Sequence, residues 1–349
     1  MKLRYRDFEP EIGQGAVIAD TAAVIGRVAA GTRLTLRSYA TVRADGERIR
    51  IGSDVYFAED ATVHIVDGKI GTTIGDSVTV GRYGLVHGCT LASDVVVGEG
   101  AAVMDAASVG AGAVVAADCI VSPGKKLEGG WLYQGIPAKA VREISVAEAA
   151  TIARAIRAGD PPAVARSNVL PERSREAPSP RGERSPAGTE RPATSYVAPT
   201  AHLSGDVRLG DDAGIYFACV VSAGDGRIVI GPRSNVQDAS FLLTSKARGD
   251  LILGAGVTIG HNVQMGSGAF GDDCLVGMMS RVADGVTVER GGCIAGGAWV
   301  EPGTVVKAGW IWAGRPARPF RELRPAERVE FARGRDVYIE YGAGYRGEP

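Results

Sequence analysis

The sequence predicts an all-β protein made of two tandem parallel β-helices, each followed by an α-helix. Three observations predict this fold class. Adding 179 to a residue number in the first half gives the matching residue of the second half without a gap. Small aliphatic residues recur every six positions in both halves. Glycine is abundant, at 49 residues, whereas aromatic residues make up only 6% of the chain, which suits a narrow core enclosed by many turns.

The six-residue period defines the strands and corners of each β-helix. Short strands joined by turns at this spacing form a coiled sheet, in which one aliphatic side chain per face points into the core. Pairs such as Ile74-Gly75 and Ile259-Gly260 mark corners, because glycine permits a positive φ or a close backbone approach. Each coil is then stabilised mainly by the coils beside it. The residues at the six-residue spacing are Val97, Val103, Val109, Val115 and Val121 in the first half and Val276, Val282, Val288, Ile294 and Val300 in the second.

An α-helix is expected after each β-helix. Ser145 and Glu148 have the spacing of a capping box, and Ile152 and Ile156 lie one turn apart beyond it. Pro325 suits the first turn of the second helix, since its fixed φ is helical and it needs no hydrogen-bond partner there. We expect both helices to pack along a face of their β-helix.

The predicted domains are residues 1–160 and residues 196–349, each a β-helix with its helix. Residues 161–195 are rich in proline, arginine and glutamate and contain no aromatic residue before Tyr196. Such a composition cannot bury a core, so we expect this segment to be a disordered linker.

Composition narrows the partners and the compartment. The chain has 39 basic and 40 acidic residues and a formal charge of -1, which provides no electrostatic footprint for nucleic acid or an anionic membrane. The first residues lack the apolar run of a secretory signal, and no stretch approaches the roughly 20 apolar residues of a membrane span. We therefore expect a cytoplasmic protein without nucleic-acid or membrane partners. The five cysteines have no CxxC spacing and are expected to be reduced core residues.

The histidines do not follow the internal repeat. His64 matches Leu243, Arg82 matches His261, and His87 matches Gly266. Three matched positions are therefore filled two to one across the copies. This complementary pattern suggests that the two copies each kept part of one site.

The first copy carries an ordered set of motifs. Arg43-Ala44-Asp45 is followed by Ile51-Gly52 and Glu59, then by His64, Val80-Gly81-Arg82 and finally His87-Gly88-Cys89. This order resembles that of the gamma-class carbonic anhydrases, and the resemblance covers both copies apart from the linker. It implies a left-handed, hexapeptide-repeat β-helix that assembles as a trimer. It also implies three histidines that bind one metal ion, usually zinc and sometimes ferrous iron, across a subunit interface.

Carried over by position, His64 corresponds to the first ligand of the family and His87 to the third, while Arg82 replaces the second. In the second copy His261 corresponds to the second ligand, but the other two are lost. The family takes its first and third ligands from one subunit and its second from a neighbour. A first-copy to second-copy interface would therefore rebuild three ligands for Zn2+ or Fe2+, whereas neither copy can do so alone.

The residues expected around the metal divide in the same way. The first copy keeps Arg43 and Asp45, where the second has Ser222 and Gly224. The second copy keeps the family's NIQD-like segment, which ends in Gln237 and Asp238. The resemblance implies that the arginine and aspartates brace the interface and that the glutamine lies near the metal-bound water. We take Arg43, Asp45, Gln237 and Asp238 as candidate catalytic residues.

The resemblance implies metal-activated hydrolytic chemistry. Three neutral imidazoles leave one coordination position open on a divalent ion, which lowers the pKa of bound water to roughly 7, the value usual for carbonic anhydrases. The hydroxide can attack carbon dioxide or a thioester carbonyl, and the partners implied are that small substrate and further copies in trimer-based rings. The segment after His64 lacks the acidic loop of the most active members, which argues against high turnover.

Two other readings remain open, so the sequence does not decide whether the protein is an enzyme. The first is a metal-free pseudoenzyme or structural assembly, because duplicated scaffolds often keep leftover histidines. The second is a coenzyme A-dependent acyltransferase, because many such enzymes use hexapeptide β-helices and Gly135 to Lys139 resembles their exit from the last coil. Coenzyme A binding would separate the second reading from the others.

Overall fold

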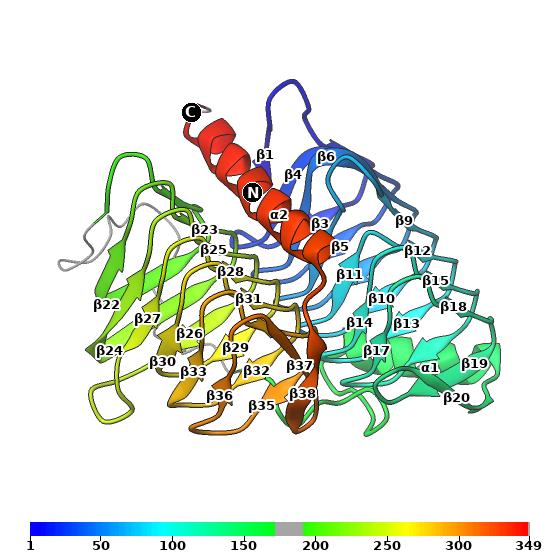
Figure 1. Ribbon diagram of the computed structural model, residues 1–349. Coiled ribbons are helices and arrows are strands. Elements are labelled where there is room, and N and C mark those ends of the chain that lie inside the picture. The colour runs from blue at the N-terminus through cyan, green and yellow to red at the C-terminus, as the bar shows by residue number, and fades with distance from the viewer. Residues whose placement is uncertain (172–190, 348–349) are drawn as a thin grey trace. The chain divides into compact units, whose positions relative to one another are not determined.

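The computed structural model describes residues 1–171 and 191–347. The chain divides into two compact units, Met1–Glu172 and Arg173–Pro349, and each is described by itself. In both units short strands stack in parallel rows (Figure 1). This confirms the predicted all-β class with a β-helix and one α-helix in each unit.

The first unit contains twenty strands and the helix α1 within its described residues. Its elements are β1 (Lys2–Leu3), β2 (Glu11–Ile12), β3 (Val17–Ile18), β4 (Ala23–Ala30), β5 (Thr35–Leu36), β6 (Thr41–Ile51), β7 (Tyr56–Phe57), β8 (Thr62–His64), β9 (Thr72–Ile74), β10 (Thr79–Val80), β11 (Leu85–His87), β12 (Thr90–Leu91), β13 (Val96–Val97), β14 (Ala102–Val103), β15 (Ser108–Val109), β16 (Val114–Val115), β17 (Ile120–Val121), β18 (Lys126–Leu127), β19 (Trp131–Gln134), β20 (Lys139–Glu143) and α1 (Val146–Arg157).

From β21, which matches β3, the described residues of the second unit follow the same order and end in the helix α2. Its elements are β21 (Tyr196–Val197), β22 (His202–Leu209), β23 (Gly214–Ile215), β24 (Val220–Ile230), β25 (Asn235–Val236), β26 (Phe241–Leu243), β27 (Leu251–Leu253), β28 (Thr258–Ile259), β29 (Gln264–Met265), β30 (Gly268–Phe270), β31 (Leu275–Val276), β32 (Arg281–Val282), β33 (Val286–Val288), β34 (Cys293–Ile294), β35 (Trp299–Val300), β36 (Val305–Val306), β37 (Trp310–Gly314), β38 (Ala317–Glu322) and α2 (Pro325–Arg346).

Each unit has three faces of parallel strands. In the first unit, one face runs through β8, β11, β14 and β17, and a second through β9, β12, β15 and β18. The long strand β6 turns the corner between these faces and pairs with both β8 and β9. The third face is the row β3-β5-β7-β10-β13-β16-β19. The corresponding strands of the second unit have the same pairing order, and most of their bounds differ by the 179 residues seen in the sequence.

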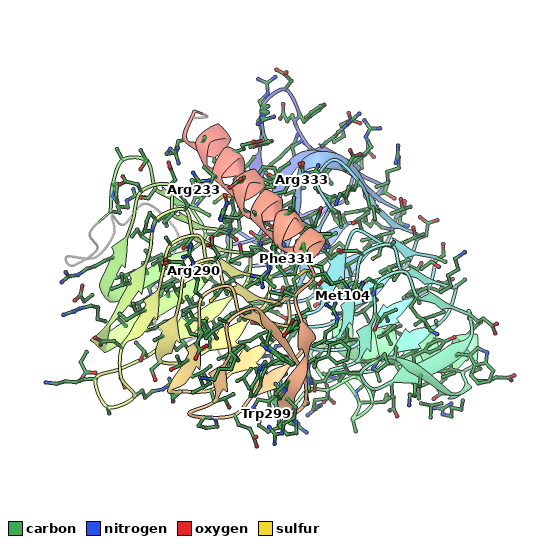
Figure 2. All side chains as sticks on the ribbon, in the orientation of Figure 1. Met104, Arg233, Arg290, Trp299, Phe331 and Arg333 are labelled. Carbon is green, nitrogen blue, oxygen red and sulfur yellow. The ribbon has the colours of Figure 1, made fainter. Side chains whose placement is uncertain are left out.

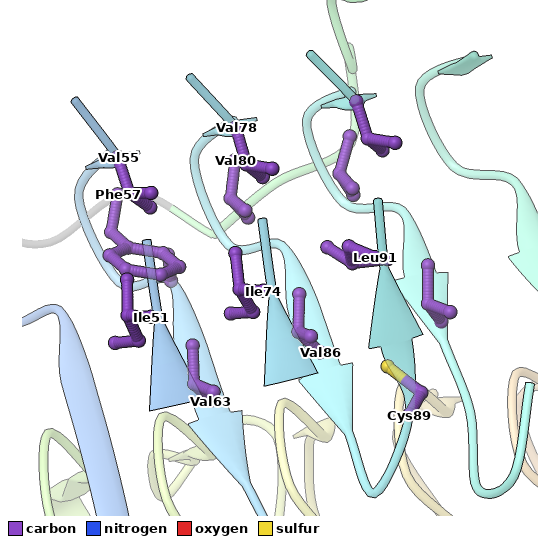
Figure 3. Packing of buried hydrophobic residues seen from close by; sticks show 14 of the residues in the cluster. Ile51, Val55, Phe57, Val63, Ile74, Val78, Val80, Val86, Cys89 and Leu91 are labelled. Atoms are coloured by element: carbon purple, nitrogen blue, oxygen red, sulfur yellow. The ribbon is translucent and has the colours of Figure 1, made fainter. Parts of the chain in front are cut away.

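The aliphatic residues at the six-residue spacing fill the core of each unit, as predicted. All ten are buried, and Figure 3 shows the stacking of such side chains on successive coils of the first unit, including Val63 next to Val86 of the following coil and Val78 beside Val80. A residue on one coil contacts its counterpart on the next because parallel strands lie about 4.8 Å apart. The core is therefore a column of small side chains with one layer per coil.

The corner glycines are required mainly for close approach between coils. A Cβ on Gly81 would lie 2.8 Å from the Glu99 amide nitrogen, and one on Gly260 would lie 2.7 Å from the Met278 nitrogen. Neither glycine has a positive φ, which occurs instead two residues further on, at Tyr83 and at Asn262. Of the two reasons expected for glycine at corners, these positions therefore use the backbone approach.

The first helix confirms its predicted cap and its buried face. The Ser145 hydroxyl accepts a hydrogen bond from the Glu148 amide, which satisfies one unpaired donor of the first turn. Ala149, Ile152 and Ile156 are buried against the third face of the unit. The helix therefore closes that face with an apolar stripe.

The second helix starts at Pro325 as predicted, but it continues to Arg346, well beyond the apolar pattern that indicated it. Phe331, labelled in Figure 2, lies in its first half and packs on the cluster that includes Leu275 and Cys293. Val329 in the same half is 71% exposed. Its second half is held by aromatic contacts of Tyr338 and Tyr345, described below. These tyrosine contacts explain the greater length, because helical stability in proteins comes largely from tertiary packing.

The expected linker is only partly described. Residues 172–190 lie outside the described residues. Before them, the Ala165 carbonyl accepts a hydrogen bond from the Glu99 amide, and the Ser167 amide donates to Glu99 Oε2 at 3.0 Å. Residues 161–171 therefore contact the first unit, although the composition of this segment led us to expect a free tether.

Two further expectations concern the cysteines and membrane insertion. All five cysteines are buried and form no disulfide with one another, as predicted. Burial raises the pKa of Cys119 and Cys293 to about 12 and that of Cys274 to about 11, and it also raises the pKa of Cys89.

Neither α1 nor α2 is long and apolar enough to cross a bilayer, and the described residues contain no other helix.

We predict that the thiols are unreactive in the folded protein. At pH 8 each of these groups is protonated and inaccessible, and the thiolate is the nucleophile in alkylation. Iodoacetamide should add to none of the five thiols in the native protein and to all five in denaturant, as counted by intact mass. Rapid native alkylation of any cysteine would contradict the buried placement.

We also predict that core and surface isoleucines of the second unit differ sharply in stability effect. Ile259→Ala removes a fully buried side chain and should lower the free energy of unfolding by about 2–5 kcal/mol. The matched control is Ile252→Ala on the neighbouring strand, where the side chain is 38% exposed and the effect should be about 0.5 kcal/mol or less. Tryptophan fluorescence in urea reports mainly this unit, because Trp299, Trp310 and Trp312 belong to it, whereas Trp131 alone lies in the first unit. Equal effects would contradict the assigned register.

Candidate functional site

The first unit brings two predicted metal ligands together on adjacent coils. His64 ends β8 and His87 ends β11, and they are direct partners in the parallel ladder. The preceding residues, Val63 and Val86, point into the core, so the histidines project from the opposite side of the sheet. His64 Nδ1 lies 3.3 Å from His87 Nε2. The register of the sheet therefore brings together two residues that lie 23 positions apart in the sequence, on adjacent coils.

A carboxylate lies at the far side of each of these imidazoles. Asp45 Oδ2 is 3.4 Å from His64 Nε2, and Asp105 Oδ1 is 2.5 Å from His87 Nδ1. Arg43 Nη1 in turn donates a hydrogen bond to Asp45 Oδ2, and both of these side chains are buried. Arg43 thus orients the carboxylate that contacts His64.

The protons on the two imidazoles decide whether the contact between His64 and His87 is attractive or repulsive. Two neutral imidazoles carry one N–H each, and the two carboxylates can accept both of them. The nitrogens that face each other, His64 Nδ1 and His87 Nε2, then present two lone pairs at 3.3 Å. With these tautomers the contact is repulsive unless a proton or a metal cation lies between the two nitrogens. Two nitrogens about 2.0–2.1 Å from one tetrahedral ion are themselves about 3.3–3.4 Å apart, so the pair fits two ligands of such an ion.

The second unit holds His261 at a corner after β28. Its Nδ1 lies 3.3 Å from Asp238 Oδ2, and its Nε2 lies 3.0 Å from the Tyr338 hydroxyl on α2. Asp238 Oδ1 also accepts a hydrogen bond from the Phe217 amide, which fixes the carboxylate. As in the first unit, a buried carboxylate lies close to one imidazole nitrogen, and the other nitrogen faces away from it.

Gln237 lies on the same coil as Asp238 and belongs to a short amide network. Its Nε2 donates to Asn235 Oδ1 at 3.2 Å, and Asn235 Nδ2 donates to Thr258 Oγ1 at 3.1 Å. These side chains are buried, so their hydrogen bonds restrict their orientation. Of the candidate residues in the second unit, Asp238 is therefore the one in contact with His261.

The third-ligand position of the second unit is filled by an ion pair. A Cβ on Gly266 would lie 2.0 Å from Asp284 Oδ1, so a side chain cannot fit there as the backbone stands. Asp284 matches Asp105 of the first unit, and Arg248 Nε donates to both of its oxygens at 3.0 and 2.9 Å. Burial opposes ionisation, but hydrogen bonds from Arg248 and Ser267 hold the pKa of the Asp284 carboxyl below its usual value. The pair gives this carboxylate a counter-charge without a histidine.

Comparisons with known proteins agree with this geometry. A carbonic anhydrase from Geobacillus kaustophilus is 34% identical over 154 residues, which cover 44% of this chain and 84% of that protein. The mitochondrial gamma carbonic anhydrase 1 of Arabidopsis thaliana is 34% identical over 159 residues, which span only 58% of its length. This chain belongs to the gamma carbonic anhydrase family. No protein-family model matches the chain.

A solved structure extends the likeness to the whole fold. A candidate acetyltransferase from Desulfovibrio desulfuricans G20 has a TM-score of 0.59 and covers 99% of this chain and 82% of its own, at 12% identity. At that identity the likeness concerns the fold alone. It carries no information on whether this gamma carbonic anhydrase relative transfers acyl groups.

Sequence reasoning missed two residues of the candidate site. Asp105 contacts His87 from the next coil of the same face, and the spacing of one coil was the available signal. Tyr338 contacts His261 from α2, and its signal was the spacing of Tyr338, Tyr341 and Tyr345 along one side of a helix. Both were missed because the family motifs lie on the strands.

We predict that Asp105 fixes the tautomer of His87. In metal-free protein, 15N NMR of the imidazole should show a proton on Nδ1, because the carboxylate accepts it. Asp105→Asn should increase the population with a proton on Nε2. Asp94→Asn is the matched control, since Asp94 is exposed and its positive φ suits asparagine, and it should leave the His87 signals unchanged. A native His87 protonated on Nε2 would contradict the assignment.

Proposed function

We propose that this protein is a gamma carbonic anhydrase-type metalloprotein in which His64 and His87 of the first copy and His261 of the second copy hold one divalent cation. The observation that supports it most directly is the contact of two imidazole lone pairs in the first unit, which a cation would make favourable. The proposed relation between the copies is tandem duplication, supported by the common 179-residue offset of their strands.

The number of histidines makes His261 the candidate third ligand. The chain has four histidines, and the first unit contains only His64 and His87. A catalytic zinc site needs three protein ligands and one open position. His261 is the histidine that matches the family's second ligand, and the Asp238 carboxylate lies beside it, as Asp45 and Asp105 lie beside the other two. Three neutral imidazoles suit either zinc or ferrous iron.

When bound, the cation would supply water activation at neutral pH for attack on carbon dioxide or a thioester carbonyl. The protein's own residues prepare its ligands. Asp45 and Asp105 each accept one imidazole proton, so one nitrogen of His64 and one of His87 keeps its lone pair. Asp238 lies 3.3 Å from His261 Nδ1, on the side of the ring away from Nε2. The Tyr338 hydroxyl contacts His261 Nε2. If Nε2 binds a cation, this contact breaks and the hydroxyl must donate its hydrogen bond to a different acceptor. Arg43 donates a hydrogen bond to Asp45 and orients its carboxylate.

The proposed assembly is a homo-oligomer of trimer-based rings, as the family resemblance implies. Three positions per ring and two copies per chain cannot alternate perfectly. Rings of one copy type would contain no complete site, mixed rings would contain two sites per three chains, and one first-to-second contact per chain would give one site per chain. The metal content therefore reports the arrangement of the copies.

Two alternatives make different predictions. A metal-free pseudoenzyme is expected to contain almost no metal and to take up none when metal is added. A coenzyme A-dependent acyltransferase is expected to bind coenzyme A, which calorimetry measures directly. The Arg248–Asp284 pair favours loss of the site in the second copy, because it neutralises the residual carboxylate locally. The His64–His87 pair in the first copy has no such replacement, and this favours retained metal binding there.

The metal-to-chain ratio tests the proposal. Protein purified without chelator and without oxygen should contain about one, or about two-thirds, of a zinc or iron ion per chain by elemental mass spectrometry. His261→Ala should reduce this ratio to near zero, because removing one of three ligands lowers metal affinity steeply. Carbon dioxide hydration and thioester hydrolysis should fall with it.

His202→Ala is the matched control, since it removes the fourth histidine, on β22 of the same unit, and should leave the metal content unchanged. Full metal content in His261→Ala would exclude the composite site. Loss of metal in both variants would point to unfolding, which circular dichroism of the same samples would reveal.

A further inference from the structure

A cavity of about 290 Å3 opens in the first unit beside the end of α1. It is lined by charged residues from three parts of the unit. Arg82 comes from the third face, Arg157 from the last turn of α1, and Arg166 from the segment that follows. The remaining charged lining residues are Arg37, Glu59 and Glu99. None of these residues belongs to the proposed metal centre.

The cavity occupies the position that matches the His261 site of the second unit. Arg82 matches His261, Glu59 matches Asp238, and Arg37 matches Tyr216. In the second unit α2 continues past this point, and Tyr338 closes it through His261 and through its own carbonyl, which accepts a hydrogen bond from Tyr216. In the first unit α1 ends at Arg157, and the chain turns away at Gly159, where φ is +82°. The same face is therefore covered in one unit and hollow in the other.

Two of the four arginines are neutralised within the unit. Arg37 Nε lies 3.2 Å from Glu59 Oε1, and Arg166 Nη2 lies 2.5 Å from Asp160 Oδ1. Their charges are thus balanced by neighbouring carboxylates. These two arginines therefore line the wall of the cavity but add little net positive charge to it.

The other two arginines lack a carboxylate partner. Arg157 donates to Thr79 Oγ1 at 2.9 Å and to the Asp54 carbonyl at 3.0 Å, both neutral acceptors, while the Asp54 carboxylate pairs with Arg33. Arg82 is exposed, and its side chain makes no hydrogen bond or ion pair with residues 1–171 or 191–347. The positive charges of these two guanidinium groups are therefore not balanced by a paired carboxylate.

Other charges at the cavity confirm a modest positive excess. The Glu99 carboxylate opposes the arginines, but its Oε2 already accepts a hydrogen bond from the Ser167 amide. The Arg157 guanidinium lies over the Tyr56 ring, 5.7 Å from its centre, and partial burial lowers the pKa of Arg157 although Asp54 opposes this. A desolvated cation of this kind is stabilised by an added anion.

We propose that this cavity binds a small oxyanion, of the size of phosphate or bicarbonate, held by Arg82 and Arg157. Guanidinium groups match such ions because their N–H donors form paired hydrogen bonds to two oxygens. The volume lies just below the usual range of about 300–1,000 Å3 for ligand pockets, which favours a small ion over a nucleotide or a peptide segment. The inference is independent of the metal centre, because it uses residues of the first unit alone.

Calorimetry with inorganic phosphate and with bicarbonate tests this proposal. The full chain is first stripped with a chelator, so that no anion can bind through a metal, and chloride keeps the ionic strength constant. At least one of the two anions should bind, and the one that binds more tightly indicates whether the cavity prefers phosphate or bicarbonate. Arg82→Gln should weaken binding by about ten- to a hundredfold, the usual value of a hydrogen bond to a charged group.

Two further variants control the experiment. Arg50→Gln removes an exposed arginine on β6, outside the cavity, and should leave the affinity unchanged. Glu99→Gln should strengthen binding, because it removes the opposing charge and keeps an oxygen for Ser167. Equal affinity in Arg82→Gln and Arg50→Gln, or no binding of either anion, would overturn the proposal. A change in association state in Arg82→Gln without anion binding would also overturn it, since the arginine would then serve a protein interface.

Discussion

Register between stacked coils is the constraint on which the rest of this structure depends. Each coil can add only one layer of small aliphatic side chains, and parallel strands lie about 4.8 Å apart, so residues at equal positions on successive coils must be neighbours. Val63 and Val86 satisfy this rule inside the first unit, and His64 and His87 satisfy it outside. The core and the candidate site are thus two sides of the same ladder.

This register also determines which polar groups contact the two histidines of the first unit. Asp45 and Asp105 approach the two imidazoles from opposite sides, which leaves two nitrogens facing each other at 3.3 Å. With these tautomers the contact becomes favourable when a proton or a metal cation lies between the two nitrogens. The second unit shows the other outcome, because Arg248 now neutralises the carboxylate that matches Asp105.

The two helices explain how matching faces diverged. α1 stops after one buried stripe, whereas α2 extends until Tyr338 contacts His261 and Tyr345 stacks on Tyr196 at 5.1 Å. The longer helix covers a histidine, and the shorter one leaves Arg82 beside an open cavity. A difference in helix length has therefore given one face of the same fold two chemical environments.

The sequence by itself determined the β-helix, the 179-residue repeat, the cap at Ser145 and the complementary histidines, because these follow from local spacing. It also placed His64 and His87 in the gamma carbonic anhydrase pattern. Only the tertiary structure decided that Asp105 and Tyr338 contact the histidines and that residues near Ala165 pack on the first unit. The physical reason is that these contacts join residues on different coils or on a helix and a coil, and their partners depend on how those elements pack.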